Sequence, residues 1–202
     1  MARTAAPGTR ERLLSAAAEL FYTRGVRAVG IQEIVNTAGC GKNLLYREFP
    51  TKAELVRAYL DWAGQEWERR AAQASQAAAP DPASQLIALV QAMTDHARET
   101  TFRGCPFRKY LSEVPGPGDP GAALASQFLQ DTRTQVDALV SQLNTSDPSL
   151  LAERIWLIME GLYSAANRPG GERTVDAAVP FAKEIIDRDG ADDRNTPLKP
   201  AT

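Results

Sequence analysis

Histidine and cysteine are scarce in this sequence, which has one histidine, His96, and two cysteines, Cys40 and Cys105, among 202 residues. Two thiols do not make a disulfide framework, and so few nitrogen and sulfur ligands do not suit a zinc-type site. No apolar run approaches the roughly 18 residues of a transmembrane helix, and the N-terminus lacks the apolar core of a signal peptide. We therefore expect a cytoplasmic protein with no metal, no cofactor and no membrane partner.

Motifs of the common enzyme classes are also missing. The sequence contains no Walker loop, no dinucleotide fingerprint and no Gly-x-Ser-x-Gly elbow. The paired acids Asp192 and Asp193 fall in a polar C-terminal stretch. We therefore expect a protein that is not an enzyme.

Charge is unevenly distributed along the chain, although the net charge is only −2. Residues 1–60 carry nine Lys and Arg against five Asp and Glu, a balance of +4, and the remaining residues have a balance of −6. Such an asymmetry suggests that the N-terminal end meets a polyanion, although surface charge often serves only solubility.

The periodicity of apolar residues is helical almost throughout. A first stripe consists of Leu13, Ala17, Leu20 and Phe21, in a helix that Thr9 could cap and Gly25 would end. Shorter apolar faces follow at residues 34–38 and 45–49. The turn Gly39-Cys40-Gly41 between them is typical of a helix-turn-helix.

Capping signals mark the helices that follow. Thr51 to Glu54 form a capping box, which opens a long helix to about Ala78. Asp-Pro pairs at 81–82, 119–120 and 147–148 predict helices at about 82–100, 120–144 and 148–167. We also expect helices near 105–113 and 174–188, with Pro180 delaying or kinking the start of the last one. The sequence thus predicts an all-α chain of about nine helices, with residues 1–8 and 189–202 as polar, flexible ends.

The stretch from Thr9 to Leu60 resembles the DNA-binding domain of the tetracycline-repressor (TetR) family. The resemblance rests on an ordered set of short motifs: Ala18-Glu19-Leu20-Phe21, Gly25, Ile34 to Gly39, Lys42, Leu45-Tyr46, Phe49-Pro50, Lys52 and Leu55. It implies a three-helix head with Lys42–Phe49 as the recognition helix, in a homodimer that binds a palindromic operator. It also implies a division into a DNA-binding domain (1–50), an effector-binding and dimerisation domain (51–188) and a tail (189–202).

Side chains that leave the core on the recognition helix are the candidates for DNA contact. Arg and Lys pair with guanine, Asn pairs with adenine, and free amides at a helix N-terminus suit a phosphate. The predicted DNA-binding residues are Gly41, Lys42, Asn43, Leu44, Tyr46, Arg47 and Lys52.

Four positions depart from the family pattern. Gly30 and Gly41 stand where the family has hydroxylated residues that cap a helix and contact phosphate, and Leu44 replaces a small or hydroxylated residue. Glu48 stands where an aromatic residue or histidine is common, and it would repel phosphate unless it pairs with Arg47, with Lys52 or with a cytosine amino group. These departures predict an unusual operator or modest affinity.

An effector site in the C-terminal region would need an apolar and aromatic lining with a few polar groups. The candidates are Trp62, Met93, His96, Phe102, Cys105, Phe107, Tyr110, Phe128, Trp156, Met159 and Tyr163. Each of these residues could instead be ordinary core. Cys105 follows a tight bend at a helix start, which could suit a thiol sensor, although a small buried apolar residue is the alternative.

Dimerisation through the last two helices is implied by the resemblance. The candidate interface residues are Leu151, Ile155, Ile158, Leu162, Phe181 and Ile185, which could equally be buried within one subunit. We therefore expect a bacterial transcriptional repressor that a small, mostly apolar effector releases from DNA. The alternative is a helical thiol or small-molecule sensor with weakened DNA binding.

Overall fold

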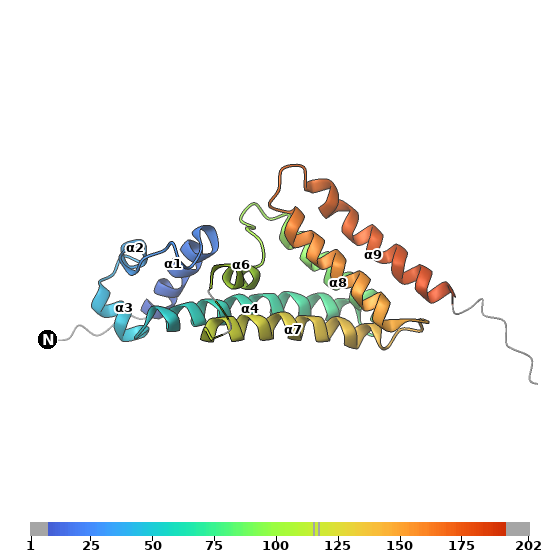
Figure 1. The fold of residues 1–202 in the computed structure, drawn as a ribbon, viewed down its shortest axis with the longest axis horizontal. Coiled ribbons are helices and arrows are strands. Elements are labelled where there is room, and N and C mark those ends of the chain that lie inside the picture. Colours follow the sequence, from blue (N-terminus) through green and yellow to red (C-terminus); the bar gives the residue numbers. More distant parts are fainter. Residues whose placement is uncertain (1–7, 115, 117, 193–202) are drawn as a thin grey trace, which may run out of the picture. The chain divides into compact units, whose positions relative to one another are not determined.

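The computed structural model describes residues 8–114, 116 and 118–192, and within that part the chain forms nine α-helices and no strand (Figure 1). The helices are α1 (Thr9–Arg24), α2 (Ile31–Thr37), α3 (Lys42–Glu48), α4 (Lys52–Ala78), α5 (Pro82–Ala97), α6 (Pro106–Glu113), α7 (Pro120–Val140), α8 (Pro148–Ala165) and α9 (Glu172–Asp192). The all-α fold is confirmed. The polar ends expected at 1–8 and 189–202 lie largely outside the described residues.

Asp-Pro pairs open three of the helices, as predicted. The carboxylates of Asp81, Asp119 and Asp147 each accept a hydrogen bond from the amide three residues later, at 2.9, 3.0 and 2.9 Å. Each bond satisfies one of the amides that a helix start leaves without an internal partner. Thr51 acts in the same way at the start of α4, where its hydroxyl accepts from the Glu54 amide at 3.1 Å.

Some expected boundaries are wrong. Gly8, not Thr9, is the N-cap of α1, and its φ of +78° is a left-handed conformation that glycine adopts readily. Thr9 is the first helical residue and is buried. Helices α5 and α7 end at Ala97 and Val140, earlier than expected. Helix α9 begins at Glu172 and continues through Pro180 to Asp192. Pro180 removes one backbone donor but does not interrupt the helix.

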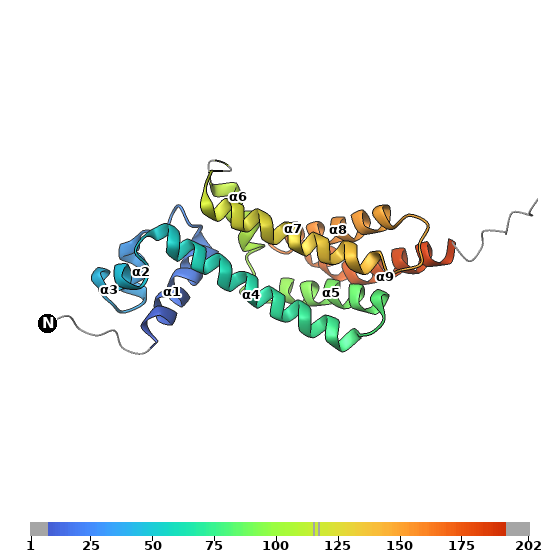
Figure 2. The same cartoon turned by 90° about the horizontal axis from the view of Figure 1, so that it is seen from below.

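Two compact units make up the structure, and each has its own core. Of the described residues, the first unit comprises 8–66 and 105–129 without 115 and 117, and the second comprises 67–104 and 130–192. In the first unit, Leu13, Phe21, Ile34 and Leu45 are buried and hold α1, α2 and α3 together as the head. In the second unit, α8 packs on α9 and both pack on α5 (Figure 2).

Candidate nucleic-acid interface and effector region

The head contains a helix-turn-helix formed by α2 and α3. Gly39 takes a left-handed conformation (φ +62°) after α2, and the Cys40 amide donates to the Val35 carbonyl at 2.9 Å. This closes the last turn of α2 and directs the chain into α3, as the glycine-containing turn predicted.

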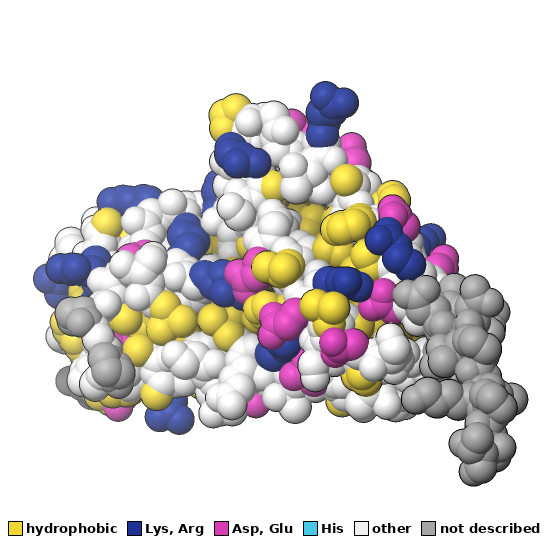
Figure 3. Space-filling view, turned by 45° about the vertical axis from the view of Figure 1, so that its right-hand side comes forward, with side chains coloured by type: hydrophobic (Ala, Val, Ile, Leu, Met, Phe, Trp, Pro, Cys, Tyr) yellow, Lys and Arg dark blue, Asp and Glu magenta, His cyan; other side chains and the backbone are white. Residues whose placement is uncertain are grey.

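Helix α3 has one buried side and one exposed polar side. Leu45 and the C-cap residue Phe49 are 0 % and 1 % exposed, and both face the core of the head. The N-cap Gly41 and four predicted contact residues are exposed: Lys42, Asn43, Tyr46 and Arg47. Leu44 is half-buried. Lys and Arg side chains are prominent over the head on the face drawn in Figure 3. This surface has the chemistry of a helix that enters a major groove.

Glu48 lies beside Arg47, one of the partners that could offset its repulsion of phosphate. One of its carboxylate oxygens is 3.6 Å from Arg47 Nη2. At that distance and with the partial exposure of both side chains, the attraction is weak. This ion pair by itself therefore restrains Arg47 only weakly.

Lys52 points into the head rather than away from it. Its Nζ donates to the carbonyls of Val26 and Val29 at 2.7 and 2.6 Å and lies 5.9 Å from the centre of the Phe21 ring. Burial lowers the pKa of Lys52, and the charge of Glu113 opposes that shift. Two of the three ammonium protons thus hold the connection between α1 and α2, which leaves one for a phosphate.

Helix α6 also holds this connection, and no sequence pattern indicated it. Glu113 accepts a hydrogen bond from the Arg27 amide at 3.0 Å, and Lys109 Nζ donates to the Tyr22 carbonyl at the end of α1. Gly25 leaves room for this contact, since a Cβ there would lie 2.5 Å from Glu113 Oε1. The end of α1 and the start of the following loop are therefore fixed by α6.

The eleven candidate effector residues fall into the two units. Trp62, Cys105, Phe107, Tyr110 and Phe128 belong to the first, and Met93, His96, Phe102, Trp156, Met159 and Tyr163 belong to the second. In the first unit, Phe107 and Phe128 stack with ring centres 3.8 Å apart, and the absence of a side chain at Gly64 leaves space for them. In the second unit, Phe102 contacts the His96 ring edge-on at 5.0 Å and stacks on Tyr163 at 6.1 Å.

His96 is the polar member of the second aromatic group. Burial lowers its pKa, and Glu99, whose Oε2 lies 3.2 Å from His96 Nδ1, opposes the shift. Among the described residues, this buried nitrogen finds no properly aligned hydrogen-bond partner. His96 Nδ1 thus faces the Glu99 carboxylate without a well-aligned hydrogen bond.

Cys105 is the N-cap of α6 and follows Gly104, whose φ is +95°. This confirms the bend and the helix start predicted there. The side chain is only 4 % exposed, so little of the thiol is open to an oxidant.

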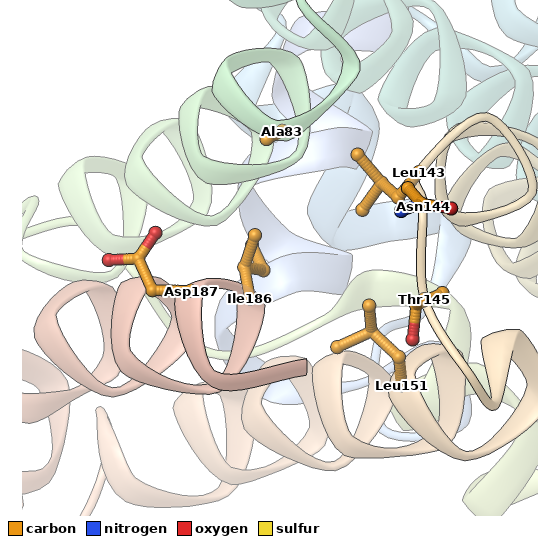
Figure 4. Close-up of a pocket in the computed structure, with 7 residues that line it drawn as sticks. All are labelled: Ala83, Leu143, Asn144, Thr145, Leu151, Ile186 and Asp187. Carbon is orange, nitrogen blue, oxygen red and sulfur yellow. The ribbon is translucent and has the colours of Figure 1, made fainter. Parts of the chain in front are cut away.

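A cavity of about 330 Å³ lies in the second unit, at the end formed by the α7–α8 connection (Figure 4). Its lining residues are Ala83, Leu143, Asn144, Thr145, Leu151, Ile186 and Asp187. None of the eleven candidate effector residues is among them. Helical spacing and aromatic character indicated the eleven candidates, whereas this cavity is lined by small, aliphatic and polar residues.

The predicted dimer-interface residues are buried within the chain, with one exception. Leu151, Ile155, Ile158, Leu162 and Ile185 are 0–8 % exposed, whereas Phe181 is 51 % exposed. A side chain already covered by its own subunit offers almost no surface to a partner. The exposed apolar residues of α8 are instead Leu150 and Leu157, at 44 % and 67 %.

Comparison with known proteins agrees with the helix-turn-helix geometry. The family described as "Bacterial regulatory proteins, tetR family" matches residues 13–59. The HTH-type transcriptional regulator YjdC of Escherichia coli is 24 % identical over 180 residues, which cover 88 % of this chain and 93 % of that protein. Over 51 residues, 25 % of this chain and 23 % of that protein, the HTH-type transcriptional activator FasR of Mycolicibacterium smegmatis is 47 % identical.

Solved structures extend the likeness to the whole fold. The TetR-family transcriptional regulator SCO4454 of Streptomyces coelicolor has a TM-score of 0.84 and 26 % identity, covering 90 % of this chain and 96 % of that one. The protein is thus a helix-turn-helix DNA-binding regulator. Its helix-turn-helix matches that of the TetR family of bacterial transcriptional regulators, a non-enzymatic family, and its whole fold is similar to that of solved TetR-family structures. No described helix is both long and apolar enough to cross a membrane.

Proposed function

We propose that this regulator is a repressor that binds a palindromic operator as a homodimer and is released by a small, mostly apolar effector. The observation that carries the proposal is the exposed polar side of α3, held in place by buried Leu45 and Phe49. In this account residues 1–50 bind DNA, and residues 51–188 bind the effector and form the dimer.

Base contacts would come from the exposed side chains of α3. Lys42 and Arg47 can each donate to guanine, and Asn43 can both donate to and accept from adenine. Tyr46, 46 % exposed, presents its hydroxyl to the DNA backbone while its ring stays partly packed. Gly41 and the exposed N-terminal amides of α3 and α4 supply backbone donors for phosphates, together with the remaining proton of Lys52.

The exposed apolar residues of α8 and α9 suit a homodimer. Leu150, Leu157 and Gly161 lie on one side of α8, and a Cβ at Gly161 would meet nothing within 4 Å. Phe181 gives α9 a matching exposed apolar side chain. Two copies related by a two-fold axis would pair these surfaces as a four-helix bundle, and two heads would then meet a palindrome.

Release by an effector needs a route to the head. Within the first unit α6 carries Phe107 of the aromatic stack and also carries Lys109 and Glu113, which fix the end of α1 and the following loop. An effector that binds one position of α6 more tightly than another would therefore shift the head between two arrangements.

The test is selection of genomic DNA fragments by the purified protein at about 0.1 M salt, where phosphate contacts are screened but present. Enrichment of one palindrome that lies over a promoter, with transcription that rises when the protein is removed, supports the proposal. A palindrome whose genes fall silent on removal would make the protein an activator. If an intact helical dimer enriches no DNA fragment, the proposal of operator binding is overturned.

Glu48 offers a second, local test. Replacing Glu48 with Gln removes a negative charge from α3, so non-specific DNA binding at low salt should strengthen. Unchanged binding would mean that Glu48 points away from DNA.

A further inference from the structure

Arg10, in the first turn of α1, reaches the end of the recognition helix. Its Nη1 donates to the carbonyl oxygen of Glu48 at 2.7 Å, and its guanidinium carbon lies 4.1 Å from the centre of the Phe49 ring. Glu48 is the last residue of α3, and Phe49 is its C-cap. Arg10 thus contacts the C-terminal end of α3 in two ways, by hydrogen bond and by stacking.

Helix α3 depends on such contacts for its direction. It has seven residues, about two turns, and a helix of that length is not stable alone. Its N-cap, Gly41, makes no side-chain capping bond. At its C-terminal end the last carbonyls lack helical hydrogen-bond donors and carry the negative end of the helix dipole. A guanidinium supplies both a donor for such a carbonyl and a positive charge that complements the dipole.

Phe49 connects this contact to the core of the head. The ring is 1 % exposed, so its position is set by the residues packed around it. A guanidinium stacked on that ring while bonded to the neighbouring carbonyl fixes the end of α3 relative to α1 as well as to the core.

We propose that Arg10 is a positioning residue, which sets the direction of the recognition helix and thereby the base contacts of Lys42, Asn43 and Arg47. Its role is distinct from that of a phosphate ligand. A cation that neutralises a phosphate releases counterions. Losing it therefore makes the slope of log affinity against log salt concentration less steep by about 0.9 per contact. Loss of a positioning residue weakens the contacts of others and leaves that dependence almost unchanged.

The experiment compares Arg10→Ala and Arg10→Lys with the wild-type protein and with Arg12→Ala, which removes the same charge from the next exposed arginine of α1. Binding is measured by fluorescence anisotropy, from about 0.05 to 0.2 M salt. The probes are a duplex with the palindrome that the wild-type protein selects and an unrelated duplex of equal length.

For Arg10→Ala we expect about a tenfold loss of operator affinity, from the loss of a charge-assisted hydrogen bond that orients the reading helix. The salt dependence should stay at the wild-type value, and binding to the unrelated duplex should change less than operator binding. Arg10→Lys keeps the charge but not the planar group, so its operator affinity should fall between those of the wild-type protein and Arg10→Ala. A salt dependence lowered by about 0.9 per contact, or an equal loss in Arg12→Ala, would overturn the proposal.

A second measurement needs no operator, so it separates this inference from the proposed repressor function. In Arg10→Ala the amides of Leu45 and Phe49, which donate to Gly41 and Leu45, should exchange hydrogen faster, while α1 amides such as that of Phe21 should not. If Arg10→Ala does not fold, Arg10→Lys gives the same comparison. Unchanged exchange at the end of α3 in a folded variant would contradict a positioning role.

Discussion

Helices α3 and α8 distribute their apolar residues in different ways, and the difference explains which contacts can be predicted. Helix α3 buries Leu45 and exposes polar neighbours, so helical spacing alone tells which side faces the core. Helix α8 is apolar on two sides, with Ile155 at 0 % and Leu157 at 67 % exposure. Spacing identifies both sides of α8 but does not tell which one is covered by the same chain.

The largest expected effect tests which side of α8 is core. Ile155→Ala should lower the free energy of unfolding by about 4 kcal/mol, because it leaves a cavity where the side chain is fully buried. Leu157→Ala should change it by about 0.5 kcal/mol or less. Urea unfolding at low protein concentration checks both, since dimer formation adds stability of its own. Equal losses would contradict the burial of this side.

Gly25→Ala comes next, and it tests the contact between α6 and the head. The backbone at Gly25 (φ +89°, ψ 151°) is open almost only to glycine, and a Cβ would displace the Glu113 carboxylate from the Arg27 amide. We expect a loss of about 3 kcal/mol in the free energy of unfolding. Gly118→Ala, where φ is not positive and a Cβ meets nothing within 4 Å, should be nearly neutral. A neutral Gly25→Ala would show that the contact does not hold the head.

Leu157→Glu sharpens the comparison from the other side of α8. A charge at the centre of the proposed interface should weaken the dimer at least about tenfold, while each subunit stays folded. Sedimentation velocity over a range of concentrations measures this. Gln130→Glu adds the same charge at an exposed position of α7 and should leave the dimer intact. A dimer unaffected by Leu157→Glu would place the interface elsewhere.

A smaller effect should follow acidification at His96. Burial lowers its pKa in the folded state, so the folded protein disfavours the charged imidazole. Stability is therefore complete above the unfolded pKa of about 6.5 and falls as the pH drops through that value toward the folded pKa. His96→Gln should reduce the loss of stability between about pH 7 and about pH 5.5, a range that spans the unfolded pKa of about 6.5. Thermal melting at the two pH values measures this. Identical pH profiles would mean that burial of His96 does not affect stability.

The smallest effect is expected at the start of α3. Gly41 has an extended backbone and open space around a Cβ, so Gly41→Ser can add a side-chain cap without strain. Serine exceeds glycine as an N-cap by a few tenths of a kcal/mol, so urea unfolding should show a gain of about that size. A loss would mean that the hydroxyl cannot reach the free amides of α3.

Local signals predicted most of the fold. The capping carboxylates of Asp81, Asp119 and Asp147 and the glycine turn at Gly39 depend on neighbours within a few residues, and all four lie as predicted. Thr9 was misjudged because Gly8 takes the capping position, a choice that depends on its left-handed backbone.

Contacts between distant residues were not visible in the sequence. Lys52, Arg10 and Glu113 satisfy backbone groups 23 to 86 residues away, and no spacing rule covers such pairs. The assignment of Leu151 and Ile155 to a dimer interface was an alternative to burial within one chain, and the structure places both in the core. Apolar periodicity predicts that a helix has a buried side, but only the packing in the structure shows which surface covers that side.

Hydroxyl-radical footprinting of the selected DNA fragment tests the central claim most directly. A dimer whose α3 helices read a palindrome should protect two symmetric patches, about one helical turn or more apart. A double substitution of Lys42 and Arg47 with alanine should abolish both patches and leave the helical fold intact. A single patch, an asymmetric one, or protection that survives the double substitution would contradict the account.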